Sequence, residues 1–432
     1  MQDRELYRQI LGIASPWRVE RVELRRADGE VHVFIEHDEQ VRWPCPEVQH
    51  RVRAPRSSIE RRWRHLDTCQ YRTILHARPP RSDCPEHGPR VVRLPWAEAS
   101  SRFTALFEAL AISWLKEASQ QGVAELPGLS WDEIHGILER AVRRGLARRG
   151  TEPTALLGVD EKSFRKRHRY LTIVNGLKRS RVLFVAEGRR KASLDGFWET
   201  LSEEQLGGVE AVAMDMWDPY VASTREHLPA SDKMIVYDKY HMAAYLAKAV
   251  DQVRRAENKR LRAAGDKRLS GTKYAWLRHP ANFSEEAWRE FRALRESDLK
   301  TARAWALQET AMRLFDYRRE SAARAFFEQW LGWARRIRLT PMVEVARMLA
   351  ARLDNILTYL KHLITNAVSE GLNSRIQWVK ATARGFRNQQ NFINAIYFHC
   401  GGLDMAQPLK TRKSLPDLPT PFGGRVLSGC FS

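Results

Sequence analysis

Five short apolar segments between residues 152 and 238 constrain the fold of this chain more than any other feature. Three follow one another closely, and two helical stretches, 193–205 and 219–227, precede the fourth and the fifth. Short apolar runs bounded by turn residues are typical of buried strands. The order of elements therefore predicts a mixed sheet with helices on both faces. The segments are ALLGVDE, YLTIVNG, RVLFVAEG, VEAVAMD and KMIVYD.

Most of these segments end in an acid, and two of the acids are expected to meet. The order of elements is that of an RNase H-like core, in which the first and fourth strands are neighbours. Asp160 ends the first strand and Asp215 ends the fourth, so their carboxylates would lie side by side at one sheet edge. Like charges held so close repel, and such pairs usually bind cations. Oxygen ligands favour Mg²⁺ or Mn²⁺, and two such ions about 4 Å apart can activate a water or a 3′-hydroxyl at a phosphodiester.

Each acid also has a structural interpretation. Asp160 could belong to a turn after its strand, and Asp215 could cap the helix that begins near Trp217. Asp218 precedes a proline and is the better helix start, so Asp215 is preferred as a metal ligand. A third acid is needed to complete a two-metal site, and Glu370 is the best candidate. Spacing alone does not select Glu370, which could equally be a surface residue at a helix end.

The charge of the chain indicates a polyanionic partner. Lysine and arginine total 72 residues against 52 aspartates and glutamates, a formal net charge of +20. Phosphate contacts by such a chain release counterions, so nucleic acid is the expected partner. A membrane is not expected, since no segment has the roughly 18 apolar residues of a span and the N-terminus lacks a signal-peptide core. Five scattered cysteines indicate reduced thiols and a cytoplasmic protein.

The N-terminal third carries the signals of strands followed by a helix-turn-helix. Alternating apolar and polar residues over 16–43 predict two strands joined at Asp28-Gly29. Ser130 and Glu133 form a capping-box pattern before a helix with a basic outer face. A short helix, a turn and a basic helix is the plan of a helix-turn-helix, although an ordinary amphipathic helix has the same pattern. The arginines predicted to point outward are Arg140, Arg143, Arg144, Arg148 and Arg149.

The C-terminal half is predicted to be almost entirely helical. Ser369-Glu370-Gly371 is expected to interrupt its last helical region, and the tail from Gln407 contains four prolines and is expected to have little fixed structure. Residues 241–366 carry aromatic side chains at helical intervals, which favour a packed core over a cofactor site. These aromatics are Trp288, Phe291, Trp305, Phe315, Phe327, Trp330 and Trp333.

Long blocks of this sequence resemble bacterial insertion-sequence transposases of the ISL3 family. The blocks are GVDEKSFRKRHRYLTIV, AVAMDMWDPYVAS, IVYDKYHMAAYLAKAVDQVRR and SEGLNSRIQWVKATARGFRNQQNFINAIYFHCGG. Upstream, ERRWRHLDTCQYRTILHARPPRSDCPEHG resembles that family's zinc-finger region, and GLSWDEIHGILERAVRRG resembles its helix-turn-helix. The resemblance extends from about Val41 to Leu403.

The resemblance implies a DDE-type enzyme whose RNase H-like core is interrupted by a helical insertion. The family's first Asp falls on Asp160 in GVDE, its second on Asp215 in AMDMW and its Glu on Glu370 in SEGLN. The resemblance thus supplies the third acid that spacing leaves open. In the DKYH block, Asp238 and His241 are candidates for orienting the site, with packing as the alternative.

Two further groups of residues are candidates for binding DNA and zinc. Arg384 and Arg387, near Phe386, could grip the DNA backbone or stack on a base, or belong to a solvated basic helix. The family usually opens its finger with Cys-Pro-x-Cys, but this chain has Val48 at the second cysteine position. Structural zinc takes four ligands. The candidate ligands are Cys45, Cys84 and His87, with His50 as a possible fourth and Cys69 as an alternative expected to point inward from a strand.

The predicted organisation is multidomain α+β, and the predicted function is transposition. The enzyme would bind the terminal inverted repeats of its element and cut and join double-stranded DNA, self-associating on element ends and target. A structure-specific RNase H-like nuclease and a DNA-binding regulator with a decayed core are the alternatives. The predicted domains are N-terminal strands 1–43, a zinc-ribbon-like module 44–98, a helix-turn-helix 101–150, the catalytic core 152–244 and 366–404, the helical insertion 245–365 and a flexible tail 405–432.

Overall fold

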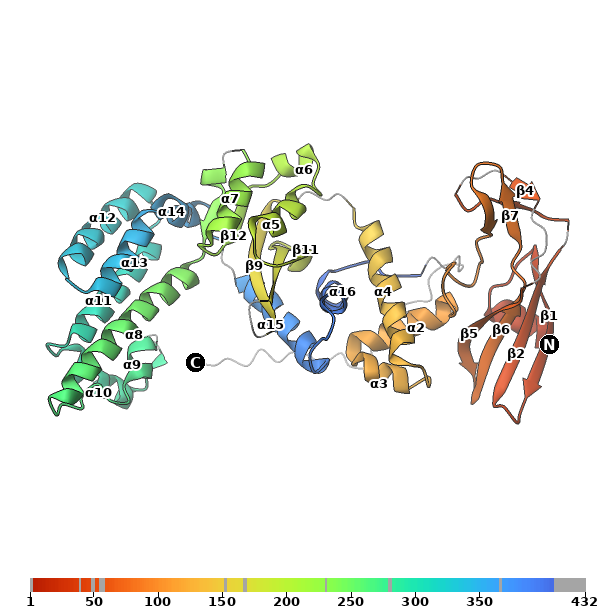
Figure 1. The fold of residues 1–432 in the computed structure, drawn as a ribbon, viewed down its shortest axis with the longest axis horizontal. Coiled ribbons are helices and arrows are strands. Elements are labelled where there is room, and N and C mark those ends of the chain that lie inside the picture. The colour runs from red at the N-terminus through yellow and green to blue at the C-terminus, as the bar shows by residue number, and fades with distance from the viewer. Residues whose placement is uncertain are drawn as a thin grey trace. The chain divides into compact units, whose positions relative to one another are not determined.

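The structure of the protein, a computed structural model, contains two compact units. Unit 1 comprises Met1–Ala147 with Asp404–Ser432, and unit 2 comprises Arg148–Leu403 (Figure 1). The residues that the structure describes are 3–38, 40–47, 51–53, 59–150, 154–165, 169–229, 231–278, 282–364 and 367–407. Most of the predicted tail from Gln407 therefore lies outside the described residues.

A four-stranded sheet forms the first part of unit 1. It has the order β1-β2-β6-β5 and follows a helix, α1 (Asp3–Ile10). The predicted hairpin at Asp28-Gly29 is confirmed, and Gly29 adopts a φ of 66°, which glycine tolerates best. Strand β2 pairs in parallel with β6, so the predicted boundary at residue 43 runs through one sheet and its shared core. The strands are β1 (Trp17–Arg25), β2 (Glu30–His37), β5 (Arg61–Thr68) and β6 (Tyr71–Ala77).

Two small hairpins and three helices complete unit 1. The hairpins pair β3 (Arg42–Pro44) with β4 (Arg51–Arg53), and β7 (Arg81–Cys84) with β8 (Gly88–Val91). The predicted capping box is confirmed, because Ser130 N donates to Glu133 Oε2 at 2.9 Å and Glu133 N donates to Ser130 Oγ at 3.3 Å. The three helices are α2 (Ala105–Glu117), α3 (Gln120–Glu125) and α4 (Trp131–Arg148).

The five predicted strands of unit 2 all form, and they make the predicted mixed sheet. The order is β11-β10-β9-β12-β13, with β9, β10 and β11 antiparallel and β9, β12 and β13 parallel. The first and fourth strands are therefore neighbours, as the RNase H-like order requires. The strands are β9 (Leu156–Arg165), β10 (Arg169–Gly176), β11 (Arg181–Glu187), β12 (Ala211–Met214) and β13 (Ile235–Tyr237).

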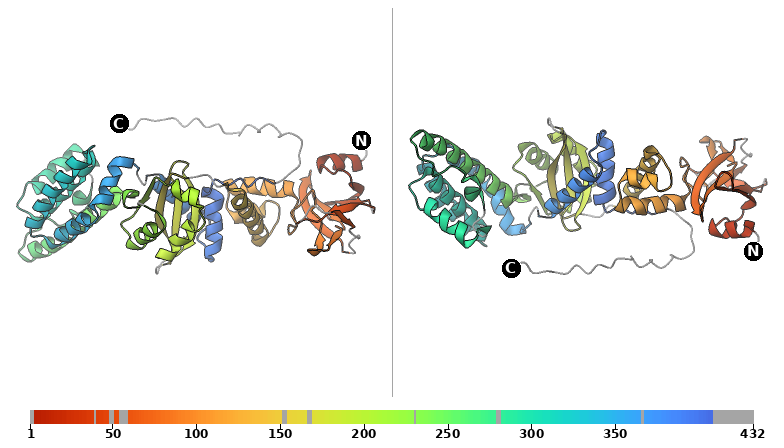
Figure 2. Two further views of the ribbon diagram at one scale, coloured as in Figure 1. Left: turned by 90° about the horizontal axis from the view of Figure 1, so that it is seen from above. Right: turned by 90° about the horizontal axis from the view of Figure 1, so that it is seen from below.

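Helices cover both faces of this sheet (Figure 2). The predicted helix over 193–205 is two helices, because Ser202 starts a second one with its own capping box. The expected interruption at 369–371 is wrong, since α15 runs through Gly371 without a break. One face carries α5 (Lys191–Trp198), α6 (Glu203–Gly207) and α7 (Asp218–His227), and the other carries α14 (Leu353–His362), α15 (Ala367–Thr382) and α16 (Gln389–Cys400).

The insertion is a bundle of helices between β13 and α14. Its long first helix, α8, packs on α11 and α13. The aromatic residues expected in the core are buried or half-buried there, with Phe291 and Trp330 almost fully enclosed, so the prediction of a packed core is confirmed. The helices are α8 (Lys239–Ala263), α9 (Lys273–Leu277), α10 (Glu285–Arg295), α11 (Lys300–Met312), α12 (Glu320–Arg336) and α13 (Thr340–Ala350).

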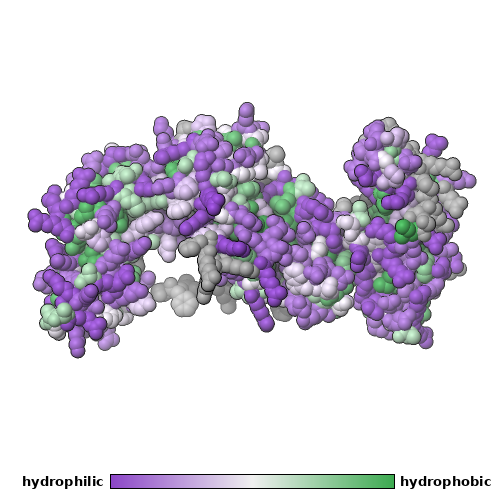
Figure 3. Space-filling model, in the orientation of Figure 1, coloured by the Kyte–Doolittle hydropathy of each residue, from purple (hydrophilic) through white to green (hydrophobic). Residues whose placement is uncertain are grey.

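The surface is strongly polar. The face drawn in Figure 3 is mostly hydrophilic, with apolar residues scattered among charged ones. Within the described residues, none of the helices combines the length and the apolar character that crossing a membrane requires.

Candidate functional site

Asp160 and Asp215 lie side by side on the neighbouring strands β9 and β12 of unit 2. Asp215 directly follows the last residue of its strand, as predicted. The prediction that Asp160 ends the first strand is wrong, because β9 continues to Arg165 along its pairing with β10. Strands β9 and β12 are parallel neighbours with Val159 opposite Met214, so the next residue of each strand is an aspartate. Burial raises the pKa of Asp160, and the charge of Asp215 raises it further. Two carboxylates held this close repel each other, and a bound cation would offset that repulsion.

His241 contacts Asp215 from the first turn of α8. Asp238 begins this helix, because its carboxylate accepts a hydrogen bond from Tyr240 N at 3.0 Å. The cap fixes the direction in which α8 leaves the sheet, and His241 Nε2 forms an ion pair with Asp215 Oδ1. Burial alone would lower the pKa of His241, but the hydrogen bond and charge of Asp215 outweigh it and the pKa is raised. Asp238 thus has a capping role, and His241 directly holds one of the two aspartates.

Asn373, on α15, holds the other aspartate. Its Nδ2 donates to Asp160 Oδ2, and its backbone oxygen accepts from Lys162 Nζ at 3.4 Å. One turn earlier, Ser369 is buried and lies 3.3 Å from the side chain of Asn175 on β10. Asn373 was not among the site residues predicted from the sequence. Its position four residues after Ser369 and three after Glu370 places it on the same side of a helix, a signal that helical periodicity offers.

Glu370 is outside this contact network. It lies on α15 between Ser369 and Asn373, and its side chain is exposed. Among the described residues, its carboxylate has no hydrogen bond or ion pair, and its backbone oxygen accepts from Ser374 Oγ at 3.0 Å. The structure therefore brings together Asp160, Asp215, His241 and Asn373, while Glu370 lies one turn before Asn373 on α15 with its side chain exposed.

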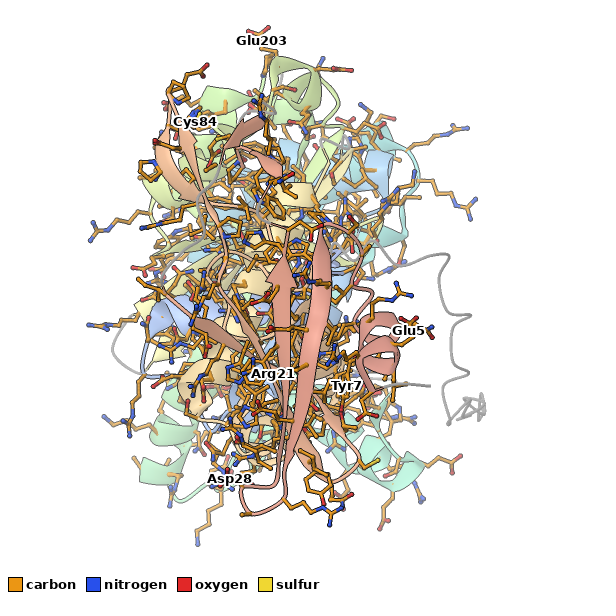
Figure 4. All side chains as sticks on the ribbon, turned by 90° about the vertical axis from the view of Figure 1, so that its right-hand side faces the viewer. Glu5, Tyr7, Arg21, Asp28, Cys84 and Glu203 are labelled. Carbon is orange, nitrogen blue, oxygen red and sulfur yellow. The ribbon has the colours of Figure 1, made fainter. Side chains whose placement is uncertain are left out.

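Three predicted zinc ligands converge in unit 1. The ligand atoms of Cys45, Cys84 and His87 all lie within 4.8 Å of one another, and Cys84 Sγ is 3.6 Å from His87 Nδ1. Figure 4 labels Cys84, the last residue of β7. Tetrahedral zinc with Zn–S near 2.3 Å and Zn–N near 2.0 Å holds neighbouring ligand atoms about 3.5 Å apart. The donor set and its spacing therefore fit a zinc ion. Val48 and His50 lie outside the described residues.

The predicted position of Cys69 is wrong. It was predicted to point inward from a strand, but it occupies the turn between β5 and β6 with a φ of 55° and is exposed. A tight two-residue turn leaves its central side chain at the surface. The alternative ligand is therefore outside the cluster of Cys45, Cys84 and His87.

Two of the arginines proposed to bind DNA have internal partners. Arg140 donates through Nε and Nη2 to the buried carboxylate of Glu108, at 2.9 and 2.6 Å. Arg144 pairs with Glu98, and its Nη2 donates to the backbone oxygen of Met405 at 3.0 Å. The prediction that these two side chains point outward is wrong, whereas Arg143 is exposed.

The side chain of Arg149 likewise does not point outward as predicted. Its guanidinium donates to the backbone oxygens of Leu183, Val182 and Gly401 in unit 2, at 2.7 to 3.0 Å. Local helical periodicity identified the face of α4 that packs inward, but it could not show which later residues cover the opposite face.

The second basic group follows α15. Arg384 and Arg387 are exposed, as a DNA-contacting role requires. Phe386 is half-buried and its ring lies 5.0 Å from that of Phe392, so it packs on α16. Asn388 caps α16 by accepting from Gln390 N at 2.8 Å. Both arginine side chains are thus exposed at the surface, next to residues that pack on α16 or cap it.

Comparison with known proteins places these residues in a family. A DDE transposase model of the ISL3 type matches residues 157–396, more than half of the chain and the whole segment from Asp160 to Glu370. The chain belongs to the ISL3 family of transposases. Two further models match upstream, the helix-turn-helix domain of transposase family ISL3 over residues 92–142 and a transposase zinc-finger over residues 42–87.

Similar full-length proteins carry the same assignment. The chain is 27% identical to the transposase for insertion sequence element IS1557 of Mycobacterium tuberculosis, over 91% of this chain and 94% of that protein. It is also 27% identical to the transposase for insertion sequence element IS1001 of Bordetella parapertussis, over 91% of this chain and 97% of that protein. The predicted family, multidomain α+β class and transposase function are confirmed. Membership implies DNA binding, DNA cleavage and joining, and divalent metal use in the DDE domain.

Proposed function

We propose that Asp160, Asp215 and Glu370 hold Mg²⁺ or Mn²⁺ for cutting and joining DNA at the ends of an insertion sequence. The observation that supports this most is the meeting of Asp160 and Asp215 on neighbouring parallel strands. Carboxylate oxygens are the ligands that both ions prefer. Two such ions, when bound, activate the attacking oxygen and stabilise the leaving oxygen of a phosphodiester.

The protein's own side chains orient this site. Asn373 fixes one oxygen of Asp160 by donating to it, and His241 fixes Asp215. Glu370 belongs to the same helix as Asn373, so α15 carries both the group that orients the first aspartate and the third proposed ligand. Outer partners of this kind tune the geometry and basicity of metal ligands.

DNA recognition is assigned to exposed arginines of both units. Arg143 on α4 is the proposed contact of the helix-turn-helix with the element ends, and Arg384 and Arg387 are proposed to contact the DNA backbone beside the catalytic domain. Joining two element ends to a target requires copies of the enzyme to act together, so self-association on DNA is part of the proposal. The site of action is chromosomal DNA in the bacterial cytoplasm.

A strand-transfer assay tests the catalytic assignment. Element-end duplexes, identified in the DNA flanking the coding sequence, are incubated with supercoiled target DNA and Mg²⁺. Asp160→Asn, Asp215→Asn and Glu370→Gln should each abolish cleavage and joining while end binding persists, because each removes one metal-ligand charge. Glu290→Gln, an exposed change on α10, is the matched control. Near-normal joining by any one of the three variants would remove that residue from the site.

The same assay separates a transposase from a nuclease. A structure-specific nuclease would release cut ends by hydrolysis and yield no joined product. Joined molecules that carry the element end covalently linked to target DNA are expected. Cut ends without joined product, at any Mg²⁺ or Mn²⁺ concentration, would favour the nuclease.

Zinc is proposed for the cluster of Cys45, Cys84 and His87, with His50 as the fourth ligand. The spacing of the first three ligand atoms supports this assignment. Metal analysis should find one zinc per chain, lost in Cys84→Ser, and removal of zinc should destabilise unit 1 because the ion joins the two hairpins. Cys69→Ser is the control and should retain zinc. A parent protein without zinc would show that packing alone holds the hairpins together.

A further inference from the structure

A cavity of about 690 Å³ lies beside the catalytic carboxylates, on the opposite face of β9. Consecutive residues of a strand point to opposite faces, so Asp160 faces α15 while Glu161 faces the side of α5 and α7. Trp217 lines this cavity two residues after Asp215. Its backbone N–H donates to the backbone oxygen of Asp215 at 2.7 Å. Asp160 is thus followed directly by Glu161, and Asp215 is followed two residues later by Trp217. Both of these following residues lie on the cavity side of the sheet.

Two aromatic rings and a guanidinium are pre-arranged in the wall of the cavity. The guanidinium of Arg189 lies over the rings of Tyr170 and Trp217, at 4.2 and 4.8 Å from their centroids. Trp217 Nε1 donates to the backbone oxygen of Arg189 at 3.0 Å, and Glu161 accepts from Arg189 Nη1 at 3.2 Å. The stack is therefore fixed from both sides, yet Trp217 remains 38% exposed, which is unusual for so large an apolar ring.

The rim of the cavity is basic. Arg190 and Lys191 line it at the start of α5. Lys191 is shared between Asp195 and Glu226, at 2.9 Å from each. Arg190 is exposed, and within the described residues no carboxylate lies at ion-pair distance from it. One cationic side chain at the cavity is therefore available for a phosphate group.

We propose that this cavity binds one unpaired nucleotide of the DNA strand that is being cut. The inference rests on the proposed function and adds a binding site to it. An aromatic ring that is rigidly held and partly exposed is a stacking platform for a nucleobase, and Arg190 is placed to contact the adjoining phosphate. A cavity of this volume accommodates a nucleotide, since ligand sites usually measure roughly 300–1,000 Å³.

The position of the cavity explains why an unpaired nucleotide is its occupant. A DNA strand whose phosphate reaches Asp160 and Asp215 has its neighbouring nucleotides close to Trp217, which lines the cavity two residues after Asp215. A base can enter only after leaving its duplex partner, and its stacking on Trp217 offsets part of the cost of unpairing. Trp217 and Tyr170 are therefore positioning residues, which bind the strand without taking part in bond cleavage.

The test uses a short oligothymidylate carrying one photoreactive 5-iodouracil and the full-length protein. Ultraviolet crosslinking followed by peptide mass spectrometry should map the crosslink to Trp217 or Tyr170. Trp217→Ala should weaken binding of this single strand roughly 5- to 150-fold, the range found when one stacked base loses its aromatic partner. Trp217→Phe keeps an aromatic ring but removes the hydrogen bond to Arg189, and it should retain most of the affinity. That result would show that the lower affinity of Trp217→Ala comes from the loss of stacking.

Matched controls make the inference separable from the catalytic assignment. Tyr274→Ala removes an aromatic residue that is 71% exposed on α9 and should leave binding and crosslinking unchanged. Equal affinities of Trp217→Ala and Tyr274→Ala, or crosslinks that map elsewhere, would overturn the proposal. Thymidine monophosphate that binds as tightly as the oligonucleotide would also overturn it, because the cavity would then be a free-nucleotide site. These measurements require no cleavage, so they stand even if the carboxylate variants retain activity.

Discussion

At the scale of single residues, the two aspartates are held by neighbours of different chemical character. Asp215 faces an imidazole and Asp160 faces an amide. The amide of Asn373 adds no charge, so it directs an oxygen of Asp160 without neutralising it. This arrangement leaves the negative charge of Asp160 for a cation while restricting the rotation of its carboxylate.

Replacement of Asn373 by alanine should slow DNA cleavage by about 10- to 100-fold, the usual effect of removing an outer partner of a metal ligand. The Mg²⁺ concentration for half-maximal cleavage should rise, whereas binding to element ends should not change. Initial cleavage rates over a Mg²⁺ titration measure both effects. Ser374→Ala, on the next residue of α15, is the control because, within the described part of the chain, the Ser374 hydroxyl donates to the backbone oxygen of Glu370 in its own helix and has no partner outside it. Equal rates in the two variants would show that Asn373 does not orient the site.

His65 makes the stability of unit 1 sensitive to acid. Burial lowers the pKa of this imidazole to about 4, and it is 2% exposed beside Thr104 Oγ1 at 2.8 Å. The unfolded chain takes up the proton near pH 6.5, so stability is unaffected above that pH and falls as pH drops from 6.5 towards 4. Between pH 6.5 and 5 the loss should be about 2 kcal/mol. Hydrogen exchange of the β5 amides at several pH values measures it.

The matched variant for this prediction is His65→Asn, which can still bond to Thr104 but does not titrate. Between pH 6.5 and 5, the free energy of unfolding of this variant should fall by about 2 kcal/mol less than that of the parent protein. If the two proteins show the same pH dependence of β5 exchange, another group is responsible for the acid response.

At the scale of elements, the sequence predicted best where short-range periodicity decides the structure. All five strands of the catalytic sheet and their order were predicted, because each is a short apolar run between turn residues. The pairing of β2 with β6 was not predicted, since it joins segments about forty residues apart that share no local signal. The continuity of α15 was missed because Gly371 is a poor helix former, and tertiary packing of this helix on β9 overrides that propensity.

The same limits apply to the candidate site. The expected pairing of the first and fourth strands predicted that Asp160 and Asp215 meet, although Asp160 lies within β9 and not at its end. The resemblance to a family selected Glu370. Neither could reveal the contact of Asn373 with Asp160, which depends on how α15 lies against β9. The internal pairing of Arg144 depends on Met405, more than two hundred and fifty residues later in the chain, and no local pattern encodes such a contact.

The packing of α15 on β9 leads to a test at Gly158. A Cβ atom added there would lie 2.3 Å from Asn175 Oδ1 and 2.7 Å from Ser369 Oγ. Gly158→Ala should therefore displace the start of α15, lowering the free energy of unfolding of unit 2 by about 1–3 kcal/mol and reducing cleavage. Denaturant unfolding followed by tryptophan fluorescence measures the first effect.

Gly371→Ala is the matched control within α15. Its added Cβ would meet no atom within 4 Å, so it should stabilise the helix by up to about 1 kcal/mol, as alanine does in place of glycine. If Gly158→Ala were as stable as the parent protein, the close approach of β9 and α15 would not be a constraint on this fold.

At the scale of the whole molecule, the net charge of +20 does not mean that every arginine is available to DNA. Three arginines have their guanidinium groups bonded to internal partners, which stabilises the units that contain them: Arg140, Arg144 and Arg149. The salt dependence of DNA binding therefore reports on a subset of the basic residues, those exposed at the surface. Neighbouring residues on α4 offer a direct comparison of the two classes.

Arg143→Ala and Arg144→Ala should affect DNA binding in different ways. Each phosphate contact contributes about 0.9 to the slope of log affinity against log salt concentration, so loss of the exposed Arg143 should weaken end binding and reduce that slope by about one. Arg144 is held by Glu98 and Met405, so its replacement should lower the stability of unit 1 and leave the slope unchanged. Binding of an element-end duplex at several salt concentrations, with thermal unfolding in parallel, distinguishes the outcomes. An unchanged slope in Arg143→Ala would move the DNA-binding face away from α4, and a reduced slope in a fully stable Arg144→Ala would show that this side chain leaves its internal partners to bind phosphate.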